Sequence, residues 1–349
     1  MLELTPTRLR ALLDVFPSLR VGVIGDFFLD AYFDCDPALD EKSLETGRTC
    51  YQVVRHRRQV GAAGTVAANL RALGVGTIEA VGYCGDDGEG YELRRAMREL
   101  ELDLAGFITA ADRFTPTYGK PCYIDGNQRS RPVIEELERL DAKNRRPTPA
   151  ALQDQIIAHI HNRLHHWDAA VLLDQVAEAN CGVLTSRVRR ALASALDHRS
   201  RPVVLADSRE RIGLFKDAIL KPNQREAMAA LDRKGRPSLK IARDCAQTLS
   251  ERTGYPVFLT LGTKGMLVAD GHAIERISAV RVAGPVDIVG AGDACSAAIS
   301  TALAAGAHLT EAAALASLAA SITVQQLGTT GTARPTQIRR RLQEVRRGL

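Results

Sequence analysis

Apolar residues along the chain follow two patterns: short continuous runs, and longer segments in which they recur every three or four positions. The short runs predict buried strands, and the periodic segments predict helices with one apolar face. The predicted strands are 20–25, 77–83, 169–174, 201–206 and a hairpin-like pair within 255–271, and the predicted helices are 5–16, 61–73, 90–101, 150–166, 294–305, 310–325 and a tail helix after 335. Strands and helices therefore alternate over most of the chain.

One stretch near the C-terminal end combines a strand end, a turn of small residues and a helix. The β-branched residues of 282–289 predict the strand end, and the helix over 294–305 contains no Gly or Pro and stops at Gly306. The turn Gly290-Ala291-Gly292 then exposes backbone N–H groups at a helix N-terminus, where an anion or a transferring phosphoryl group is favoured. Asp293 is either a cap of this helix or a general base beside the anion site.

Composition narrows the class of protein. A chain of 349 residues holds two average domains or one large α/β domain with an insertion, and 45% hydrophobic and 25% charged residues suit a sizeable core. The net charge of +5 suits phosphorylated ligands and is too small to indicate nucleic-acid binding. No apolar run is long enough for a membrane span, no signal-peptide pattern is present, and the seven cysteines are scattered without a C-x-x-C pair. We therefore expect a cytoplasmic protein that binds neither membranes nor nucleic acid.

The segment Asp287-Ile-Val-Gly-Ala-Gly-Asp293 resembles the D-T-x-G-A-G-D signature of the ribokinase-like (phosphofructokinase B-type) sugar kinases. In that family the last Asp takes the proton from the sugar hydroxyl, and the Gly-Ala-Gly amides stabilise the transferring phosphoryl group. The resemblance assigns these roles to Asp293 and to Gly290, Ala291 and Gly292. Ile288 stands where the family usually has Thr, so no hydroxyl contact is expected from this position.

Further matches concern the sugar side of the site. Gly25-Asp26-x-x-Leu29-Asp30 is similar to the G-D-x-x-L-D of the kinase half of heptose-phosphate kinase/ADP-heptose synthases. The segment 61–70 resembles the motif G-G-x-x-x-N-x-A-x-x-L, with Ala62 and Thr65 replacing the second Gly and a sugar-binding Asn; a purely structural helix start is the alternative. The resemblance implies substrate contacts by Asp26, Asp30, Gly61, Ala62, Thr65, Asn69 and Asp174.

Two other motif matches indicate where the nucleotide would bind. Thr260-Leu-Gly262-Thr-Lys-Gly265 closely matches the T-x-G-x-x-G segment that wraps nucleotide phosphates and ribose in this family, and the chain has no Walker-type phosphate loop. Asn223 and Glu226 match the N-x-x-E motif, which orders Mg²⁺ through water; three residues apart at a helix start, they either face one ligand or form a capping pair. The implied cofactors are ATP and Mg²⁺, with a monovalent cation such as K⁺ near Asp287.

Two stretches, 33–60 and 115–136, are strand-like but polar, and in the second an Asp125-Gly126 turn separates 118–124 from 127–134. We assign both stretches to one lid that closes over the sugar and excludes water. Arg129 and Arg131 are either exposed lid charges or contacts for a sugar or phosphate. As in relatives, we expect a homodimer through apolar lid residues, which are Tyr51, Val53, Tyr123 and Ile124.

Together these matches imply a doubly wound, mostly parallel α/β/α sheet with a small β lid, forming a single domain over 1–349. The implied function is ATP-dependent phosphorylation of a hydroxyl on a sugar or sugar phosphate, with Asp293 as the general base. A non-catalytic regulator that binds nucleotide or sugar, and a nucleoside kinase of the same fold, remain alternatives. We expect no nucleotidyltransferase half, and no metal at His161 and His165, which lie four residues apart on a predicted helix.

Overall fold

The structure is a computed structural model that describes residues 4–126, 128, 132–196 and 202–348. Within these residues the central sheet has nine strands in the order β16-β15-β14-β13-β12-β11-β1-β6-β7. In this order, all neighbouring strands from β7 to β14 pair in parallel. At the other edge β15 pairs antiparallel with both β14 and β16. Their bounds are β1 Arg20–Gly25, β6 Thr77–Gly85, β7 Asp103–Ala110, β11 Ala169–Asp174, β12 Val203–Ser208, β13 Ile219–Leu220, β14 Val257–Thr260, β15 Met266–Ala269 and β16 Ile274–Ile277.

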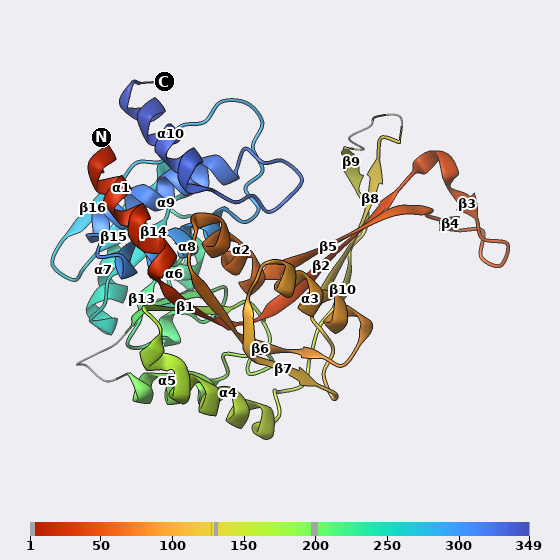
Figure 1. Cartoon of the computed structure of the whole chain (residues 1–349), viewed down its shortest axis with the longest axis horizontal. Coiled ribbons are helices and arrows are strands. Elements are labelled where there is room, and N and C mark those ends of the chain that lie inside the picture. Colours follow the sequence, from red (N-terminus) through yellow and green to blue (C-terminus); the bar gives the residue numbers. More distant parts are fainter. Residues whose placement is uncertain (1–3, 127, 129–131, 197–201, 349) are drawn as a thin grey trace.

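Helices cover both faces of this sheet (Figure 1). In β11, Val171 and Leu173 point into one core cluster, and Ala170 and Leu172 point into the other, as expected for a strand buried on both faces. The helices that pack into the first cluster are α1 Pro6–Val15, α2 Ala63–Leu73, α3 Gly88–Glu99, α8 Ala291–Ala304, α9 Leu309–Thr323 and α10 Pro335–Arg346. The helices that pack into the second cluster are α4 Ala150–Arg163, α5 Ser186–Ala195, α6 Gln224–Ala230 and α7 Leu239–Thr253. The predicted doubly wound, mostly parallel fold is therefore confirmed.

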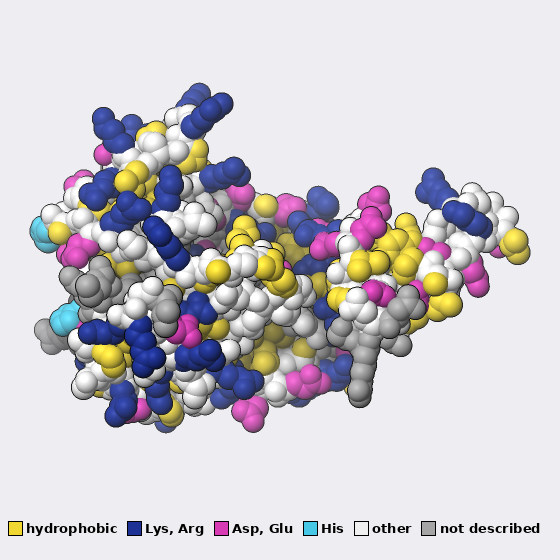
Figure 2. Space-filling view, turned by 90° about the horizontal axis from the view of Figure 1, so that it is seen from above, with side chains coloured by type: hydrophobic (Ala, Val, Ile, Leu, Met, Phe, Trp, Pro, Cys, Tyr) yellow, Lys and Arg dark blue, Asp and Glu magenta, His cyan; other side chains and the backbone are white. Residues whose placement is uncertain are grey.

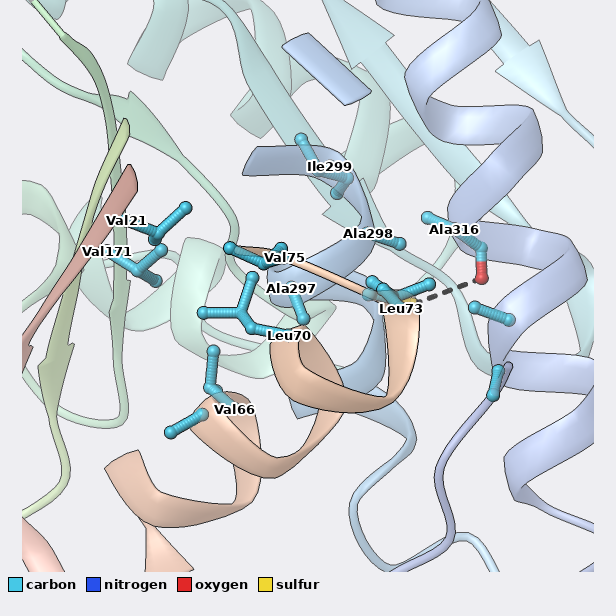
Figure 3. Packing of buried hydrophobic residues seen from close by; sticks show 14 of the residues in the cluster. Val21, Val66, Leu70, Leu73, Val75, Val171, Ala297, Ala298, Ile299 and Ala316 are labelled. Atoms are coloured by element: carbon cyan, nitrogen blue, oxygen red, sulfur yellow. Dashed lines mark hydrogen bonds between the residues drawn. The ribbon is translucent and has the colours of Figure 1, made fainter. Parts of the chain in front are cut away.

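Helix α8, which follows the glycine turn, is held in place by close packing on α2. Its Ala-rich face lets the two helices approach, so that the larger apolar side chains of α2 fill the space between α8 and the sheet (Figure 3). Replacing a leucine in such a core by alanine costs about 2–5 kcal/mol. The side chains involved are Val66, Leu70 and Leu73 of α2 and Ala297, Ala298 and Ile299 of α8, beside Val21 and Val171 of the sheet.

Several helix boundaries follow the sequence signals. Thr5 caps α1 by accepting from the N–H of Arg8 at 3.1 Å, and Gly74 ends α2 in the left-handed conformation. The N-terminal boundary of α9 differs from the prediction, because His308 rather than Thr310 is its cap residue, and Glu311 completes the capping box.

A second sheet projects from the body as the lid (Figure 1). It pairs the strands in the order β10-β8-β2-β5, with β9 added to β8, and a short β3-β4 pair lies near its end. The lid strands start earlier and end later than the polar stretches suggested, because the root of the lid carries apolar residues such as Phe27 and Phe28 that are buried against the body. Their bounds are β2 Phe27–Cys35, β3 Glu41–Lys42, β4 Thr49–Cys50, β5 Val53–Ala62, β8 Thr117–Ile124, β9 Val133–Glu136 and β10 Leu140–Ala142.

One sequence prediction in the body and one in the lid were wrong, and two edge strands of the body were not predicted. Residues 282–289 form no strand; Val282, Val286 and Ile288 instead line a cleft, which explains their apolar character. The edge strands β7 and β16 were missed, since neither is a continuous buried run. The second lid strand begins at Val133, and Arg129 and Arg131 lie outside the described residues.

In the described part of the chain no helix is long and apolar enough to cross a membrane, and no group of three or more His, Cys, Asp or Glu side chains is placed to hold a metal ion. His161 and His165 accordingly belong to no such group. All seven cysteines are unpaired, and all are buried except Cys50, which is half-buried on β4 of the lid.

Candidate active site

A cleft of about 760 Å³ opens at the carboxyl ends of the parallel strands. Its walls include Asp293, the segment Thr260–Gly265, and the start of α6 with Asn223 and Glu226. The catalytic and nucleotide-side residues predicted from separate motifs therefore share one cavity, at the sheet edge where open α/β folds bind ligands.

The start of α8 explains how Asp293 is presented to this cleft. Gly290 is the cap residue of the helix with φ 79°, a left-handed conformation that favours glycine, and it offers no capping side chain. Asp293 is the third residue of the helix, makes no capping hydrogen bond, and has no hydrogen-bond partner among the described residues. Its carboxylate is thus available to a ligand rather than used as a cap.

The three predicted amides of the glycine turn are not equivalent. The N–H of Ala291 donates to the carbonyl of Ile288 at 3.2 Å, so it is already engaged. The N–H of Gly292 has no backbone or side-chain acceptor in the described chain and lies at the positive end of the helix dipole.

The surroundings of Asp293 change its acidity. Burial raises the pKa of Asp293, the nearby carboxylate of Asp207 raises it further, and Lys221 and Arg209 act in the opposite direction; the resulting pKa is about 7. A carboxylate with a pKa near neutrality is well matched to taking and releasing a proton at physiological pH.

Lys221 was not identified from the sequence, although it directly precedes the Pro222-Asn223 pair. Its side chain is buried, with only 4% exposed, and its Nζ lies 2.9 Å from Oδ2 of Asp207. Burial lowers the pKa of Lys221, but the combined attraction of Asp207 and Glu226 outweighs this and leaves the pKa raised, so the side chain is charged. A Cβ added to Gly292 would lie 3.6 Å from this Nζ, which places the ammonium group beside the glycine turn.

Asn223 and Glu226 form the capping pair that the sequence had left as an alternative. The Oδ1 atom of Asn223 accepts from the N–H groups of Arg225 and Glu226 at 2.9 and 3.0 Å, and Oε2 of Glu226 accepts from the N–H of Asn223 at 2.7 Å. Both residues nevertheless line the cleft, and burial raises the pKa of Glu226. Capping and facing a ligand are therefore compatible here.

The turn between β14 and β15 has the backbone that its glycines predict. Gly262 and Gly265 have φ of 60° and 96°, and a Cβ on Gly265 would lie 2.0 Å from the carbonyl oxygen of Ile277. Thr260 is bridged to Asn223, so this turn and the start of α6 form one wall.

The sugar-side residues meet at the root of the lid. Asp30 lies on β2 with Oδ2 3.2 Å from Nζ of Lys120, and it raises the pKa of Asp293. A Cβ on Gly61 would lie 3.0 Å from the Asp30 carboxyl carbon, and a Cβ on Gly290 would lie 3.5 Å from Cγ2 of Thr65. The start of α2 is therefore next to both Asp30 and the glycine turn of α8.

Three other predicted contacts are occupied by the protein itself. Asp26 accepts from the N–H groups of Val183, Gln175 and Val176 at 2.7, 2.8 and 3.1 Å, and burial raises its pKa to about 6. Asp174 pairs with Arg211 at 2.7 Å, and Asn69 donates to the carbonyl of Thr65 within α2 at 3.0 Å and to the carbonyl of Gly331 in a loop at 3.5 Å. These side chains hold loops around the site in place.

Two further predicted residues, Ala62 and Asp287, shape the backbone near the site. Ala62 adopts φ 54° and ψ −117°, a conformation that favours the glycine found at this point in the family motif. Asp287 accepts from the N–H groups of Val289 and Gly328 at 3.0 and 3.2 Å, so both of its oxygens order the loop before α8.

Comparison with known proteins identifies relatives of this chain. The bifunctional protein HldE of Caulobacter sp. (strain K31) is 33% identical over 318 residues, covering 90% of this chain and 61% of that protein. HldE of Trichlorobacter lovleyi is 30% identical over 327 residues, covering 92% and 62%. The chain thus spans about three fifths of the length of these curated relatives.

Solved structures show the same fold. Phosphofructokinase-2 from Escherichia coli, in complex with potassium, superposes with a TM-score of 0.71 at 18% identity and covers 93% of this chain and 99% of that one. Arabidopsis thaliana ribokinase, complexed with ribose and ATP, has a TM-score of 0.67 at 16% identity, covering 93% and 98%. The model of the pfkB family carbohydrate kinases matches residues 34–337. With that match over most of its length, the chain belongs to the pfkB family of carbohydrate kinases.

Proposed function

We propose that this protein transfers the γ-phosphoryl group of ATP to a hydroxyl of a sugar or sugar phosphate, with Asp293 as the general base. The observation that carries the proposal is the unpartnered carboxylate of Asp293 in one cleft with Thr260–Gly265. A base with a pKa of about 7 accepts the hydroxyl proton, a contribution worth about 10²–10⁴-fold in rate.

Charge around Asp293 suits a phosphoryl group. The ammonium group of Lys221 lies beside Gly292, and Lys221, Gly292 and Arg209 all line the cleft. Such fixed donors stabilise the charge that develops on the transferred group without reorganisation.

The start of α6 fits Mg²⁺ held through water. Asn223 and Glu226 offer oxygen ligands at the cleft, and Oε1 of Glu226 has no hydrogen bond among the described residues. Mg²⁺ binds few protein groups and keeps several waters, and when bound with ATP it neutralises phosphate charge. A K⁺ site near Asp287 stays a prediction, to be tested by comparing turnover in potassium and sodium salts.

On the acceptor side, Asp30, Gly61 and Thr65 support a sugar site under the lid. Asp26, Asn69 and Asp174 act by positioning neighbouring loops, Asn69 through the carbonyl of Gly331. We also infer that residues 1–349 act as one kinase domain, since a single residue separates β1 from β2 and β5 runs directly into α2.

We infer a homodimer formed through the lid. Tyr51 and Val53 are each 42% exposed, and hydrophobic side chains are visible on the projecting arm (Figure 2). Tyr123 is half-buried beside Tyr51, whereas Ile124, also predicted to belong to this surface, is buried within the lid and is not available. Seven unpaired thiols support a cytoplasmic location for the enzyme.

The test is an ATP-dependent phosphorylation assay over sugars, sugar phosphates and nucleosides. We expect Asp293→Asn to lower kcat by about 10²–10⁴-fold while ATP still raises the Tm as it does in the wild type. Asp244→Asn, an exposed acid on α7, is the matched control and should keep full turnover.

The other outcomes separate the alternatives. Transfer to nucleosides alone would identify a nucleoside kinase of this fold. Sugar and ATP binding without any transfer by the wild type would identify a regulator. Turnover that is unchanged in Asp293→Asn would disprove the role of this residue as the base.

A further inference from the structure

The lid presents a polar face near the acceptor site, built from neighbouring strands. Asp30 on β2 lies directly opposite Gln59 on the antiparallel strand β5. Side chains at directly opposite positions lie on the same face, with Cβ atoms about 4.5–5.5 Å apart. Gly61, two residues further along β5, lets the Asp30 carboxylate approach the backbone, since a Cβ there would lie 3.0 Å from Oδ1 of Asp30.

Two acceptor atoms on this face lack donors. Asp30 is only 5% exposed, and its Oδ1 atom is buried without a hydrogen-bond partner. The Oε1 atom of Gln59 is likewise buried without a partner. Buried polar atoms are nearly always paired, so two unpaired acceptors on adjacent strands indicate a missing pair of donors.

The basic residues of the lid do not supply those donors. Arg55 and Arg57 both pair with Asp34, at 2.6 and 2.9 Å. Lys120 contacts the other oxygen of Asp30 and the hydroxyl of Tyr32, at 3.2 and 3.3 Å. Lys120 therefore fixes the carboxylate of Asp30 and leaves Oδ1 for a ligand.

We propose that Gln59 is a specificity-determining residue for the acceptor: with Asp30, it accepts hydrogen bonds from two neighbouring hydroxyl groups of one sugar. The chemical class is a polyhydroxylated sugar with a vicinal diol, since hydroxyl groups are the donors that two adjacent acceptors require. This inference rests on the proposed function for the location of the acceptor and adds a residue that selects it. Because Gln59 lies on the lid and the ATP-side residues lie on the body, replacing Gln59 should change the affinity for the sugar and not the affinity for ATP.

The experiment compares wild type with Gln59→Met, which keeps the length of the side chain and removes its amide. Ribose, fructose 6-phosphate and a heptose 7-phosphate are the probes, and their Kd is measured by calorimetry with a non-hydrolysable ATP analogue present. For the sugar that binds wild type most tightly, we expect a Kd raised about three- to tenfold, the effect of one neutral hydrogen bond, and an unchanged Kd for the analogue.

A matched control and deoxy sugars make the test specific. Gln128→Met carries the same chemical change on an exposed residue of the lid turn and should leave every Kd unchanged. Monodeoxy versions of the best sugar should reveal one hydroxyl whose removal weakens binding to wild type but not to Gln59→Met, as expected when the two partners contact each other.

The results of this experiment distinguish a failure of the role of Gln59 from a failure of the proposed function. A selective loss of sugar affinity in Gln59→Met supports the inference even if wild type transfers no phosphate, a result that would contradict only the proposed function. Equal sugar affinity in wild type, Gln59→Met and Gln128→Met overturns the inference and leaves the proposed function standing. Failure of all three sugars to bind wild type also overturns it.

Discussion

At the scale of single residues, the site depends on a carboxylate that the protein leaves without a partner. Asp293 sits in the first turn of α8 and has neither a cap role nor an ion pair with any residue that the structure describes. Its neighbours set its pKa near 7: burial and Asp207 raise the pKa, and Lys221 offsets part of this effect. In its proposed role as general base Asp293 acts in the ionised form, so the rate should depend on pH.

The pH profile of kcat/KM tests this point. Because a base must be deprotonated to act, we expect kcat/KM to fall about tenfold per pH unit below about pH 7 and to reach a plateau above it. Initial rates between pH 5.5 and 9 at saturating ATP provide the measurement. The residual activity of Asp293→Asn should lack this inflection, and a wild-type kcat/KM that stays flat from pH 9 down to pH 5.5 would contradict the assigned environment.

At the scale of elements, the junction between β5 and α2 joins the lid to the body without a linker. β5 ends at Ala62 and α2 begins at Ala63. Ala62 has φ 54° and ψ −117°, a conformation that costs a residue with a Cβ about 1–3 kcal/mol.

We expect Ala62→Gly to raise the free energy of unfolding by about 1 kcal/mol, the relief of strain exceeding the entropy that glycine adds to the unfolded chain. Urea denaturation measures the difference. Ala68→Gly, in the middle of α2, is the control and should lower stability by about 1 kcal/mol. Equal losses in both variants would show that Ala62 is unstrained.

The strands that are buried on both faces could be predicted from the sequence. Features that depend on contacts between residues far apart in the sequence could not. The strand at 169–174 was predicted with its observed bounds because every residue in it is buried. Residues 282–289 were misread because apolar side chains that line a cleft look like those of a strand. The places of Gln59 and Lys221 at the site could not be predicted from their neighbours in the sequence. Each depends on a residue of another element, Asp30 for Gln59 and Asp207 for Lys221.

At the scale of the whole molecule, the body holds the ATP-side cleft and the lid projects from it with exposed apolar residues (Figures 1 and 2). Apolar groups on a projecting sheet are stabilised when a second copy covers them.

We therefore expect wild type to be a dimer at micromolar concentrations and Val53→Asp to be a monomer, because a charge at this position would be desolvated in the interface. Light scattering after gel filtration gives both masses. Val15→Asp places the same charge on α1, outside the lid, and should remain dimeric. A monomeric wild type, or a dimeric Val53→Asp, would exclude the lid as the interface.

The distribution of thiols has a practical consequence for observing this enzyme at work. Cys50 is the one cysteine that is not buried, and it lies on β4, far out on the projecting sheet. A maleimide dye should therefore react there first, giving the natural chain a single fluorescent reporter on its projecting arm. Closure over a sugar could then be followed in real time by stopped-flow mixing, without removing the other six thiols.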